Sequence, residues 1–252
     1  MKWTAEKLKR YKQASDYTAF HKKLSVLAEP YLDGDWTLAD VGCGPGLLSI
    51  CLAPMVRSID AIDNNSLVID DLEARLGDVR LTDRRTADKI TPRLASYEDL
   101  TGECWDALVL SFFGINEKLL ETVLPLAGKR ALVYMRGRRE AEGLFASKDD
   151  GEKFSVPDME AYLAQNNLAF RKNVMEMQFG QPFRDIEDIH RFLRAYRVRL
   201  ELQGTGNDYD DSVERQLADA EERIIQTKRY DYPYYLPKST SVALFIIRTQ
   251  RS

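Results

Sequence analysis

Short apolar runs alternate with amphipathic stretches along most of the chain. Runs of this length are typical of buried strands, and apolar residues that recur every three or four positions between them predict helices. Alternation of the two is typical of a doubly wound α/β fold, with a mostly parallel sheet and helices on both of its faces. We expect seven strands, at residues 37–41, 56–63, 90–95, 105–111, 130–135, 170–179 and 242–248.

The segments between these strands predict helices at 47–53, 66–76, 117–124 and 156–166. Gly77 is expected to interrupt or end the second of them, because glycine is a poor helix former. Pro92 makes the third strand a weak one, because proline cannot donate a hydrogen bond to a sheet.

Two segments lie outside this alternation. Apolar residues recur at helical spacing before Pro30, and about 57 residues separate the last two strands, where a loop of ~4–6 is ordinary. We therefore expect a single domain, 1–252, with four parts: an N-terminal helical cover (1–32), a core (33–180), a helical insertion (181–237) and the last strand (238–252).

The insertion itself predicts two helices. Residues 185–200 have one apolar face, and Asp211 and Glu214 have the spacing of a capping box for a second helix. Because loops at the carboxyl ends of the strands carry specificity in doubly wound folds, we interpret the insertion as a substrate lid. Its candidate substrate-binding residues are Arg191, Tyr232 and Tyr235. A hairpin that forms a homodimer, with tyrosines packed as spacers, is the alternative.

Glycine occupies every second position after the first strand, in Asp40-Val41-Gly42-Cys43-Gly44-Pro45-Gly46. Such a loop turns tightly and lets a ligand approach the backbone, since no Cβ stands in the way. The N–H groups at the start of the following helix are free to point at that ligand. Asp63 ends the second strand, 17 positions after Gly46, where it can accept both hydroxyls of a ribose.

This stretch resembles motif I and the ribose-binding acid of class I S-adenosylmethionine-dependent methyltransferases. Its G-x-G-x-G spacing differs from the dinucleotide fingerprint, because Leu47 stands where the last glycine would be. The match covers about residues 37–63, and the later order of elements agrees with the family. The resemblance implies S-adenosylmethionine as cofactor and S-adenosylhomocysteine as product. The cofactor-binding residues that it implies here are Asp40, Gly42, Cys43, Gly44, Gly46, Asp63 and Asn64.

The same resemblance implies roles at the ends of later strands. Ser96 and Tyr97 take the place of the residues that meet the adenine, and Ser111 lies near the cofactor. Phe112 and Phe113 either wall an apolar substrate pocket or belong to the core. Their segment lacks the Pro-Pro-Tyr sequence of enzymes that methylate base amines or glutamine amides, which disfavours that chemistry.

The loop 136–140 contains three arginines, and Arg136 is its candidate for a carboxylate or phosphate of a substrate. A solvated loop is the alternative reading. A general base is needed only for an acceptor that is protonated at neutral pH. Tyr11, Tyr17 and His21 are the candidates, in a segment that in the family folds over the cofactor. The sequence does not single out one of them, and each also suits the core of a covering helix, as does Phe20.

The composition narrows the cellular setting. The 252 residues are 44% apolar and 30% charged, as in ordinary globular proteins. The apolar runs are far shorter than the ~18 residues that span a membrane, and the first residues hold no apolar signal core. We therefore expect a cytoplasmic protein with no membrane contact. Three cysteines and two histidines favour neither a disulfide framework nor a zinc site, and no metal is expected.

Charge is spread unevenly. Residues 1–23 hold seven Lys and Arg against two acidic residues, in a chain whose net charge is −4. A basic helix on an acidic body can contact nucleic acid, although a solvated helix face is the preferred interpretation. We expect a methyltransferase that acts on a small-molecule acceptor. An RNA or protein methyltransferase, and a cofactor-binding scaffold or regulatory subunit without catalysis, remain alternatives.

Overall fold

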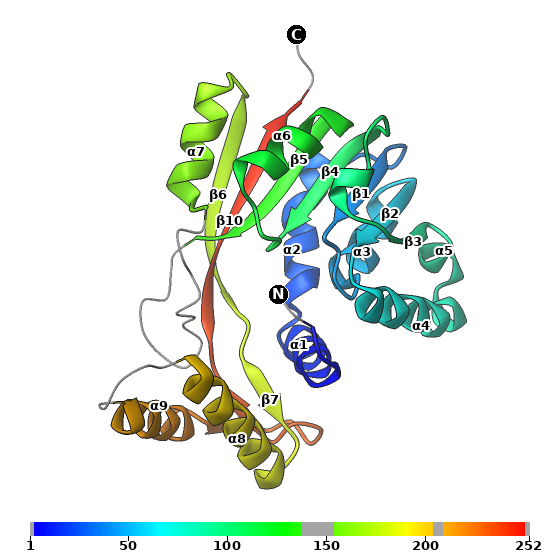
Figure 1. Ribbon diagram of the computed structural model, residues 1–252. Helices are drawn as coiled ribbons and strands as arrows, with labels where there is room; N and C mark the ends of the chain where they lie inside the picture. The colour runs from blue at the N-terminus through cyan, green and yellow to red at the C-terminus, as the bar shows by residue number, and fades with distance from the viewer. Residues whose placement is uncertain (1–2, 138–153, 204–208, 250–252) are drawn as a thin grey trace.

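A computed structural model describes residues 3–137, 154–203 and 209–249, so Arg138, Arg139 and Glu140 of the arginine loop lie outside the described residues (Figure 1). The main sheet has seven strands in the order β3-β2-β1-β4-β5-β10-β6. β10 is antiparallel to both of its neighbours, and the remaining pairs are parallel. The predicted doubly wound, mostly parallel sheet is therefore confirmed. The strands are β1 (Thr37–Val41), β2 (Ser58–Asp63), β3 (Ile90–Leu94), β4 (Trp105–Ser111), β5 (Ala127–Arg136), β6 (Phe170–Gln178) and β10 (Ser239–Arg248).

Helices cover both faces of this sheet, and each face has its own apolar core. Leu108 and Leu110 of β4 pack on one face, while Ala107 and Val109, which alternate with them, pack on the other. On the first face lie α6 (Glu117–Val123) and α7 (Val156–Gln165), with the short 3-10 helices η3 (Tyr97–Asp99) and η4 (Leu124–Leu126). On the second lie α2 (Phe20–Ala28), α3 (Leu47–Leu52), α4 (Ser66–Thr82) and α5 (Arg84–Ala87), with η1 (Glu29–Tyr31) and η2 (Ala53–Met55).

The sequence predicted local effects of Pro92 on a strand and of Gly77 on a helix, and the two predictions have different outcomes. Pro92 is accommodated because β3 is an edge strand of the sheet, where one side of the backbone needs no donor. The expectation for Gly77 was wrong: α4 continues through it to Thr82. Leu76 is buried and Val79 packs on the same core, so tertiary packing on both sides of Gly77 outweighs a helix-propensity cost of about 1 kcal/mol.

The N-terminal segment is helical, as predicted, and it forms two helices. α1 (Ala5–Thr18) is followed by Ala19, whose φ of 53° is left-handed, and α2 begins at the next residue. α2 packs on the main sheet through Phe20, Leu24 and Ala28. α1 turns away from that sheet toward the insertion, so the two helices have different partners (Figure 1).

The insertion is carried on an extension of β6 and β10. In the main sheet Gln178 lies opposite Ser239, and Phe179 donates a backbone hydrogen bond to Lys238 (2.8 Å). The same register continues in a second, three-stranded sheet of β7 (Gln181–Phe183), β9 (Tyr234–Leu236) and β8 (Ile225–Gln226), in which Gln181 lies opposite Leu236. A single antiparallel ribbon thus leads from the carboxyl edge of the main sheet into the insertion.

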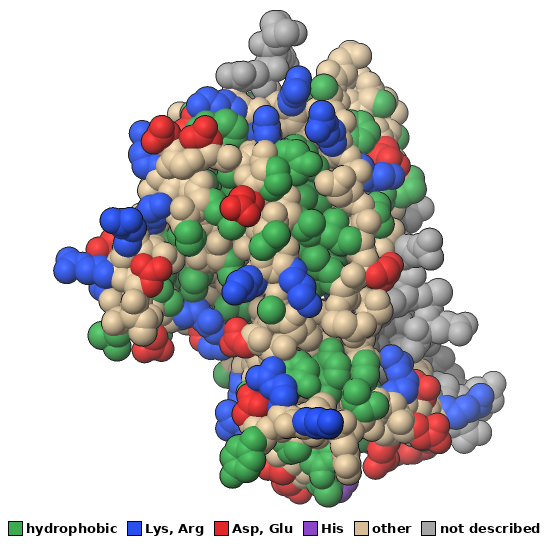
Figure 2. All heavy atoms as spheres, turned by 180° about the vertical axis from the view of Figure 1, so that it is seen from behind, with side chains coloured by type: hydrophobic (Ala, Val, Ile, Leu, Met, Phe, Trp, Pro, Cys, Tyr) green, Lys and Arg blue, Asp and Glu red, His purple; other side chains and the backbone are tan. Residues whose placement is uncertain are grey.

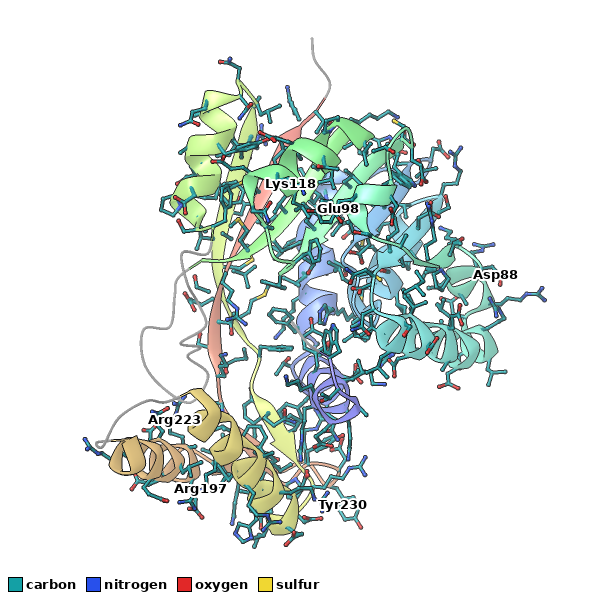
Figure 3. The ribbon with its side chains drawn as sticks, viewed as in Figure 1. Asp88, Glu98, Lys118, Arg197, Arg223 and Tyr230 are labelled. Atoms are coloured by element: carbon teal, nitrogen blue, oxygen red, sulfur yellow. The ribbon has the colours of Figure 1, made fainter. Side chains whose placement is uncertain are left out.

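We call residues 181–237, as far as they are described, the distal unit. Besides the small sheet it contains α8 (Ile186–Gln203) and α9 (Tyr209–Glu222). Arg197 of α8, labelled in Figure 3, pairs with Glu214 of α9. Its own apolar core consists of Phe183, Ile189, Ala220 and Leu236. The predicted capping box was wrong, because α9 already begins at Tyr209. Consecutive acids at 210 and 211 allow more than one start of the helix.

No helix within the described ranges is long and apolar enough to cross a membrane.

Candidate functional site

The glycine loop lies at the carboxyl end of β1, between β2 and β4. Gly42, Gly44 and Gly46 have φ angles of 74°, 54° and 65°, a left-handed conformation that favours glycine. A Cβ on Gly46 would collide with Leu72 of α4, so this glycine also permits close helix packing. Gly42 donates to the carbonyl of Ile62 (2.8 Å), which ties the loop to β2.

Asp63 is fixed against this loop by backbone donors. Its Oδ2 accepts a hydrogen bond from Gly44 N (2.9 Å) and its Oδ1 accepts one from Asn65 N (3.0 Å). A carboxylate has about four acceptor positions, so two remain for a ligand. The side chain is half-buried at the sheet edge, and the neighbouring Asn64 is exposed. Asp63 is therefore placed to bind a pair of hydroxyl groups.

Asp40 is a buried carboxylate with one satisfied oxygen. Its relative exposure is 1%, and Ser49 Oγ donates to its Oδ2 at 2.5 Å. Its Oδ1 is buried without a hydrogen-bond partner among the described residues. Burial raises the pKa of Asp40 to about 7, with nearby Asp63 adding to the rise and the hydrogen bond from Ser49 opposing it. A buried acceptor left open in this way suits a cationic or donor group of a ligand.

Tyr11 of α1 and His21 of α2 are brought together where the two helices meet. The Tyr11 hydroxyl lies 2.9 Å from His21 Nε2, and Ser15 Oγ lies 2.6 Å from His21 Nδ1. Burial, together with the charge of Arg75, lowers the pKa of His21 to about 3, so the ring is neutral at pH 7. Burial and the charge of Asp40 raise the pKa of Tyr11, while Arg136 acts in the opposite sense. The hydroxyl of Tyr11 therefore lies in the electric fields of both charged groups.

An aromatic cluster encloses this pair. Tyr11 packs edge-on against Trp3 and Phe179, with ring centroids 5.3 Å apart in both cases. Phe20 packs on Phe179 (4.6 Å) and on Phe112 (5.7 Å). Trp3 also reaches the glycine loop, since its ring lies 3.5 Å from the position of a Cβ on Gly44. Sequence reasoning missed Trp3 and Phe179 as site residues, because nothing local marks two aromatics so far apart in the chain.

The exits of β3 and β4 lie beside the loop and its acid, since Ala95 N donates to the carbonyl of Asp63 (3.1 Å) and Val41 lies opposite Leu110. Tyr97 packs edge-on against Phe113 (6.3 Å), and the ring of Phe113 rests on Gly42. Ser111 ends β4 half-buried. Ser96 caps η3, and its hydroxyl donates to Glu98 (2.5 Å).

Arg136 and Cys43, two other residues of the predicted site, form no ion pair with another described residue. Arg136 ends β5 exposed. Burial raises the pKa of the Cys43 thiol, which keeps it neutral inside the loop. Within the described ranges no group of three His, Cys, Asp or Glu side chains is arranged to hold a metal ion.

Three predicted residues belong to the distal unit instead. Tyr235 stacks on Tyr17 of α1 (4.7 Å), and Tyr232 packs edge-on against the same ring (6.0 Å). Arg229 adds a cation over Tyr17 at 4.5 Å. Arg191 is exposed on α8, and no contact between described residues links it to the glycine loop. Tyr17, Tyr232 and Tyr235 thus hold α1 against the distal unit.

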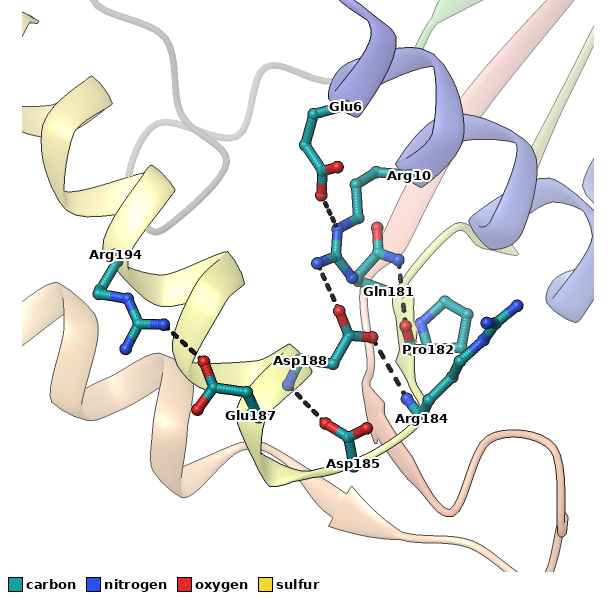
Figure 4. Close-up of polar contacts among 9 residues, drawn as sticks. All are labelled: Glu6, Arg10, Gln181, Pro182, Arg184, Asp185, Glu187, Asp188 and Arg194. Atoms are coloured by element: carbon teal, nitrogen blue, oxygen red, sulfur yellow. Dashed lines mark hydrogen bonds and ion pairs between the residues drawn. The ribbon is translucent and has the colours of Figure 1, made fainter.

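A buried ion pair completes that attachment (Figure 4). Arg10 of α1 donates through Nη2 to Asp188 Oδ1 (2.6 Å) and through Nε to Glu6 Oε1 (2.8 Å). Its guanidinium lies over the rings of Phe183 and Phe192, 5.8 and 5.7 Å from their centroids. The helix that carries Tyr11 is therefore clamped to the distal unit.

Comparison with solved structures confirms the fold that the motif implied. The chain is similar to magnesium protoporphyrin IX methyltransferase from Synechocystis with bound S-adenosylhomocysteine (TM-score 0.54, 14% identity, 98% of this chain and 89% of that one). It is also similar to a cyclopropane-fatty-acyl-phospholipid synthase-like protein from Lactobacillus casei (0.54, 14%, 97% and 94%). A third is the YcgJ protein of Bacillus subtilis (0.56, 13%, 93% and 100%). No model of a known protein family matches the chain, and no curated protein is similar to it in sequence.

Proposed function

We propose that the chain binds S-adenosylmethionine and transfers its methyl group to a small-molecule acceptor. The observation that carries this proposal is the free, buried Oδ1 of Asp40 beside the glycine loop and the fixed carboxylate of Asp63. Asp63 would hold the ribose hydroxyls, and Asp40 would hold the ammonium of the methionine part. The bound S-adenosylhomocysteine of the Synechocystis enzyme, which has the same fold, supports this choice of ligand.

The cofactor would supply a methyl group on a sulfonium that leaves as a neutral thioether. The work of this chain's own residues is then to align the reactants and to exclude water. Trp3, Tyr11, Phe20, Phe112 and Phe179 form the apolar surroundings that exclude water. His21 is kept neutral by its burial and by the charge of Arg75, and its hydrogen bond to Tyr11 fixes the orientation of the Tyr11 hydroxyl.

The nature of these groups also bears on the acceptor. Neither His21, with its lowered pKa, nor Tyr11, with its raised pKa, takes up a proton readily at pH 7. An acceptor that arrives deprotonated fits them best, and Arg136 at the exit of β5 is available to pair with its negative charge. The lack of a ready proton acceptor and the position of Arg136 both favour a small acceptor with a carboxylate or another ionised group.

The nucleic-acid alternative is less well supported. In the basic N-terminal run, Arg10 pairs with Asp188 and Lys12 pairs with Asp71, so both charges are neutralised within the molecule. On the face shown in Figure 2, basic and acidic side chains are interspersed rather than separated. A nucleic-acid interface would present one continuous basic surface.

The ligand assignment is tested with Asp63→Ala. We expect S-adenosylhomocysteine binding to weaken by about 1.5–3 kcal/mol, the contribution of charged hydrogen bonds, in isothermal titration calorimetry. Asp70→Ala, at an exposed acid of α4, is the matched control and is expected to bind like wild type. Unchanged affinity in Asp63→Ala would contradict the site.

Catalysis is tested separately with methyl-labelled S-adenosylmethionine and a fractionated cell extract. We expect the label to enter a low-molecular-weight compound other than S-adenosylmethionine itself. Label in RNA or protein would favour the macromolecular alternative. Binding without any transfer would favour a scaffold or regulatory role.

A further inference from the structure

β6 is the last strand of the main sheet, and among the described residues it is paired only on the side that faces β10 (Figure 1). The other end of the sheet is protected, because β3 has five residues with Pro92 in the middle of them. β6 has nine residues and no proline. A long edge without such protection is suited to pairing with a further strand.

The register with β10 determines which residues of β6 direct backbone groups to the free edge. The bonds that flank the pairing run from Phe179 N to the carbonyl of Lys238 (2.8 Å) and from Arg248 N to the carbonyl of Ala169 (2.9 Å). Residues that bond to the neighbouring strand alternate in an antiparallel pair, so the odd-numbered residues of β6 bond to β10. The even-numbered residues, from 170 to 178, therefore direct their N–H and C=O groups outward.

Three of the even-numbered residues are a cation, an apolar residue and an anion in succession: Lys172, Val174 and Glu176. All three are exposed, and the exposed fraction of Val174 is 56%. Lys172 pairs with Glu160 of α7 (2.6 Å), and Glu176 accepts a hydrogen bond from Ser239 (3.0 Å). An ammonium has three donors and a carboxylate has about four acceptor positions, so each charged group can take a further partner.

This order of side chains is complementary to itself when the strand is read in the opposite direction. If a second β6 pairs antiparallel about a two-fold axis at Val174, Lys172 of each copy lies opposite Glu176 of the other. These are hydrogen-bonded positions, where opposite charges stabilise the pairing of two strands. An axis at Lys172 or at Glu176 would place like charges opposite each other. An axis at Asn173 or at Met175 would leave both charges without a charged counterpart.

We propose that the free edge of β6 is a dimer interface, to which a second copy of this chain adds its own β6 in the antiparallel register centred on Val174. The interface is isologous, since the same surface serves on both copies. It differs from the dimer through the helical hairpin of the insertion, which was the alternative drawn from the sequence.

The direction of β6 determines how the two copies face. β6 runs in the same direction as β5, because β10 lies antiparallel between them, and β5, β4 and β1 are parallel. Antiparallel pairing of two β6 strands therefore points the carboxyl ends of the two parallel sets, and with them the two glycine loops, in opposite directions.

The test is the molar mass in solution, measured by sedimentation equilibrium. Pairing of two nine-residue strands is at the small end of protein interfaces, so we expect a dissociation constant on the order of 10 μM. Across this concentration the wild type should pass from the 28.9 kDa of one chain toward twice that mass. Lys172→Glu and Glu176→Lys each place like charges opposite each other at two positions of the dimer, and each should weaken dimerisation by about tenfold or more.

A mixture of these two single variants separates the register from other causes. In the mixed dimer each position 172 lies opposite a position 176 of opposite charge, so we expect the mixture to dimerise at a concentration where each variant alone is monomeric. The double variant Lys172→Glu/Glu176→Lys should dimerise with itself for the same reason. It still lacks the contact of Lys172 with Glu160, so its recovery would not come from within one chain.

Arg171→Glu is the matched control. It makes the same change of charge on the neighbouring residue, which lies opposite Met177 in the proposed register, and it should dimerise like wild type. Val174→Pro supplies a second measurement: the N–H that it removes points away from β10, so the β6–β10 pairing is kept while the dimer is lost.

Three outcomes would overturn the proposal. A wild type that keeps the mass of one chain at every concentration would leave the edge of β6 to a different chain. A dimer that survives both single charge variants would indicate an interface elsewhere, such as the insertion. Failure of the mixed variants to associate would contradict the register centred on Val174.

Discussion

At the scale of single residues, Asp40 sets an electrostatic condition for the whole site. Its carboxyl group is buried, accepts one short hydrogen bond from Ser49, and keeps its second oxygen open. A buried carboxylate that has no cation favours the protonated form. Ionisation of Asp40 therefore costs free energy in the folded chain, and a cationic ligand beside it would reduce that cost.

This cost predicts a particular dependence of stability on pH. Between the ordinary value of 3.8 and the raised pKa of about 7, the folded chain binds more protons at Asp40 than the unfolded chain does. The free energy of unfolding should therefore fall as the pH rises through this window. Relative to wild type, Asp40→Asn is expected to gain about 2–3 kcal/mol between pH 5 and pH 8.

Urea unfolding of both proteins at the two pH values measures this gain. Other titrating groups cancel in the difference between variant and wild type. A difference that does not change with pH would show that Asp40 titrates near its ordinary value.

At the scale of elements, α1 belongs structurally to the distal unit as much as to the core. Arg10, which is 8% exposed, joins it to Asp188 of α8, and Tyr17 stacks on Tyr235 of β9. The same helix carries Tyr11, whose ring packs on Trp3 beside Gly44, so the position of Tyr11 depends on contacts made far from the glycine loop.

Asp188→Ala tests the clamp. The change leaves the guanidinium of Arg10 buried without its main partner, and we expect a loss of about 3–5 kcal/mol in the free energy of unfolding. The double variant Arg10→Met/Asp188→Leu, which replaces the pair by apolar side chains, should recover most of that loss. Chemical denaturation measures both effects.

Glu187→Ala is the control on the same helix. Glu187 pairs with Arg194 at 2.8 Å, but both side chains are more than 60% exposed. Its removal should change stability by less than about 1 kcal/mol. An equal loss from both alanine variants would show that burial adds nothing to the clamp.

The elements also show what sequence reasoning could and could not reach. The glycine loop and Asp63 were predictable because one local stretch, 37–63, contains the strand, the turn, the helix and the acid. Arg10 and Asp188 are 178 positions apart, and their contact depends on the ribbon that carries α8. The second sheet was not predicted, because β7, β8 and β9 contain only two or three residues each and show no alternation.

At the scale of the whole molecule, the chain consists of a large part built on the main sheet and a small part, the distal unit. The main sheet is covered on both faces, whereas the core of the distal unit consists of four buried apolar residues and their half-buried neighbours. In Figure 3 the distal unit lies at one end of the molecule, with the fully exposed Tyr230 at its margin. Unequal cores imply unequal local stability.

Hydrogen exchange should detect this difference. We expect amides of the β7–β9 pairing to exchange through partial openings of lower free energy than amides of the β4–β5 pairing, because fewer apolar contacts oppose the opening. Exchange followed by mass spectrometry of peptides from both pairings measures it. Equal protection would indicate that the clamp makes the two parts a single cooperative unit.

The unbroken register from β6–β10 into β7–β9 restricts how this architecture can vary in length. Loss of one residue from one strand would slip the pairing and send every following side chain to the opposite face. Only matched changes of two residues in each strand keep the faces, and each such change moves the distal unit by about 7 Å along the ribbon. The distance between the main sheet and the distal unit can therefore change only in steps of about 7 Å. An engineer who transplants it onto another sheet must choose among a few discrete spacings rather than tune the distance continuously.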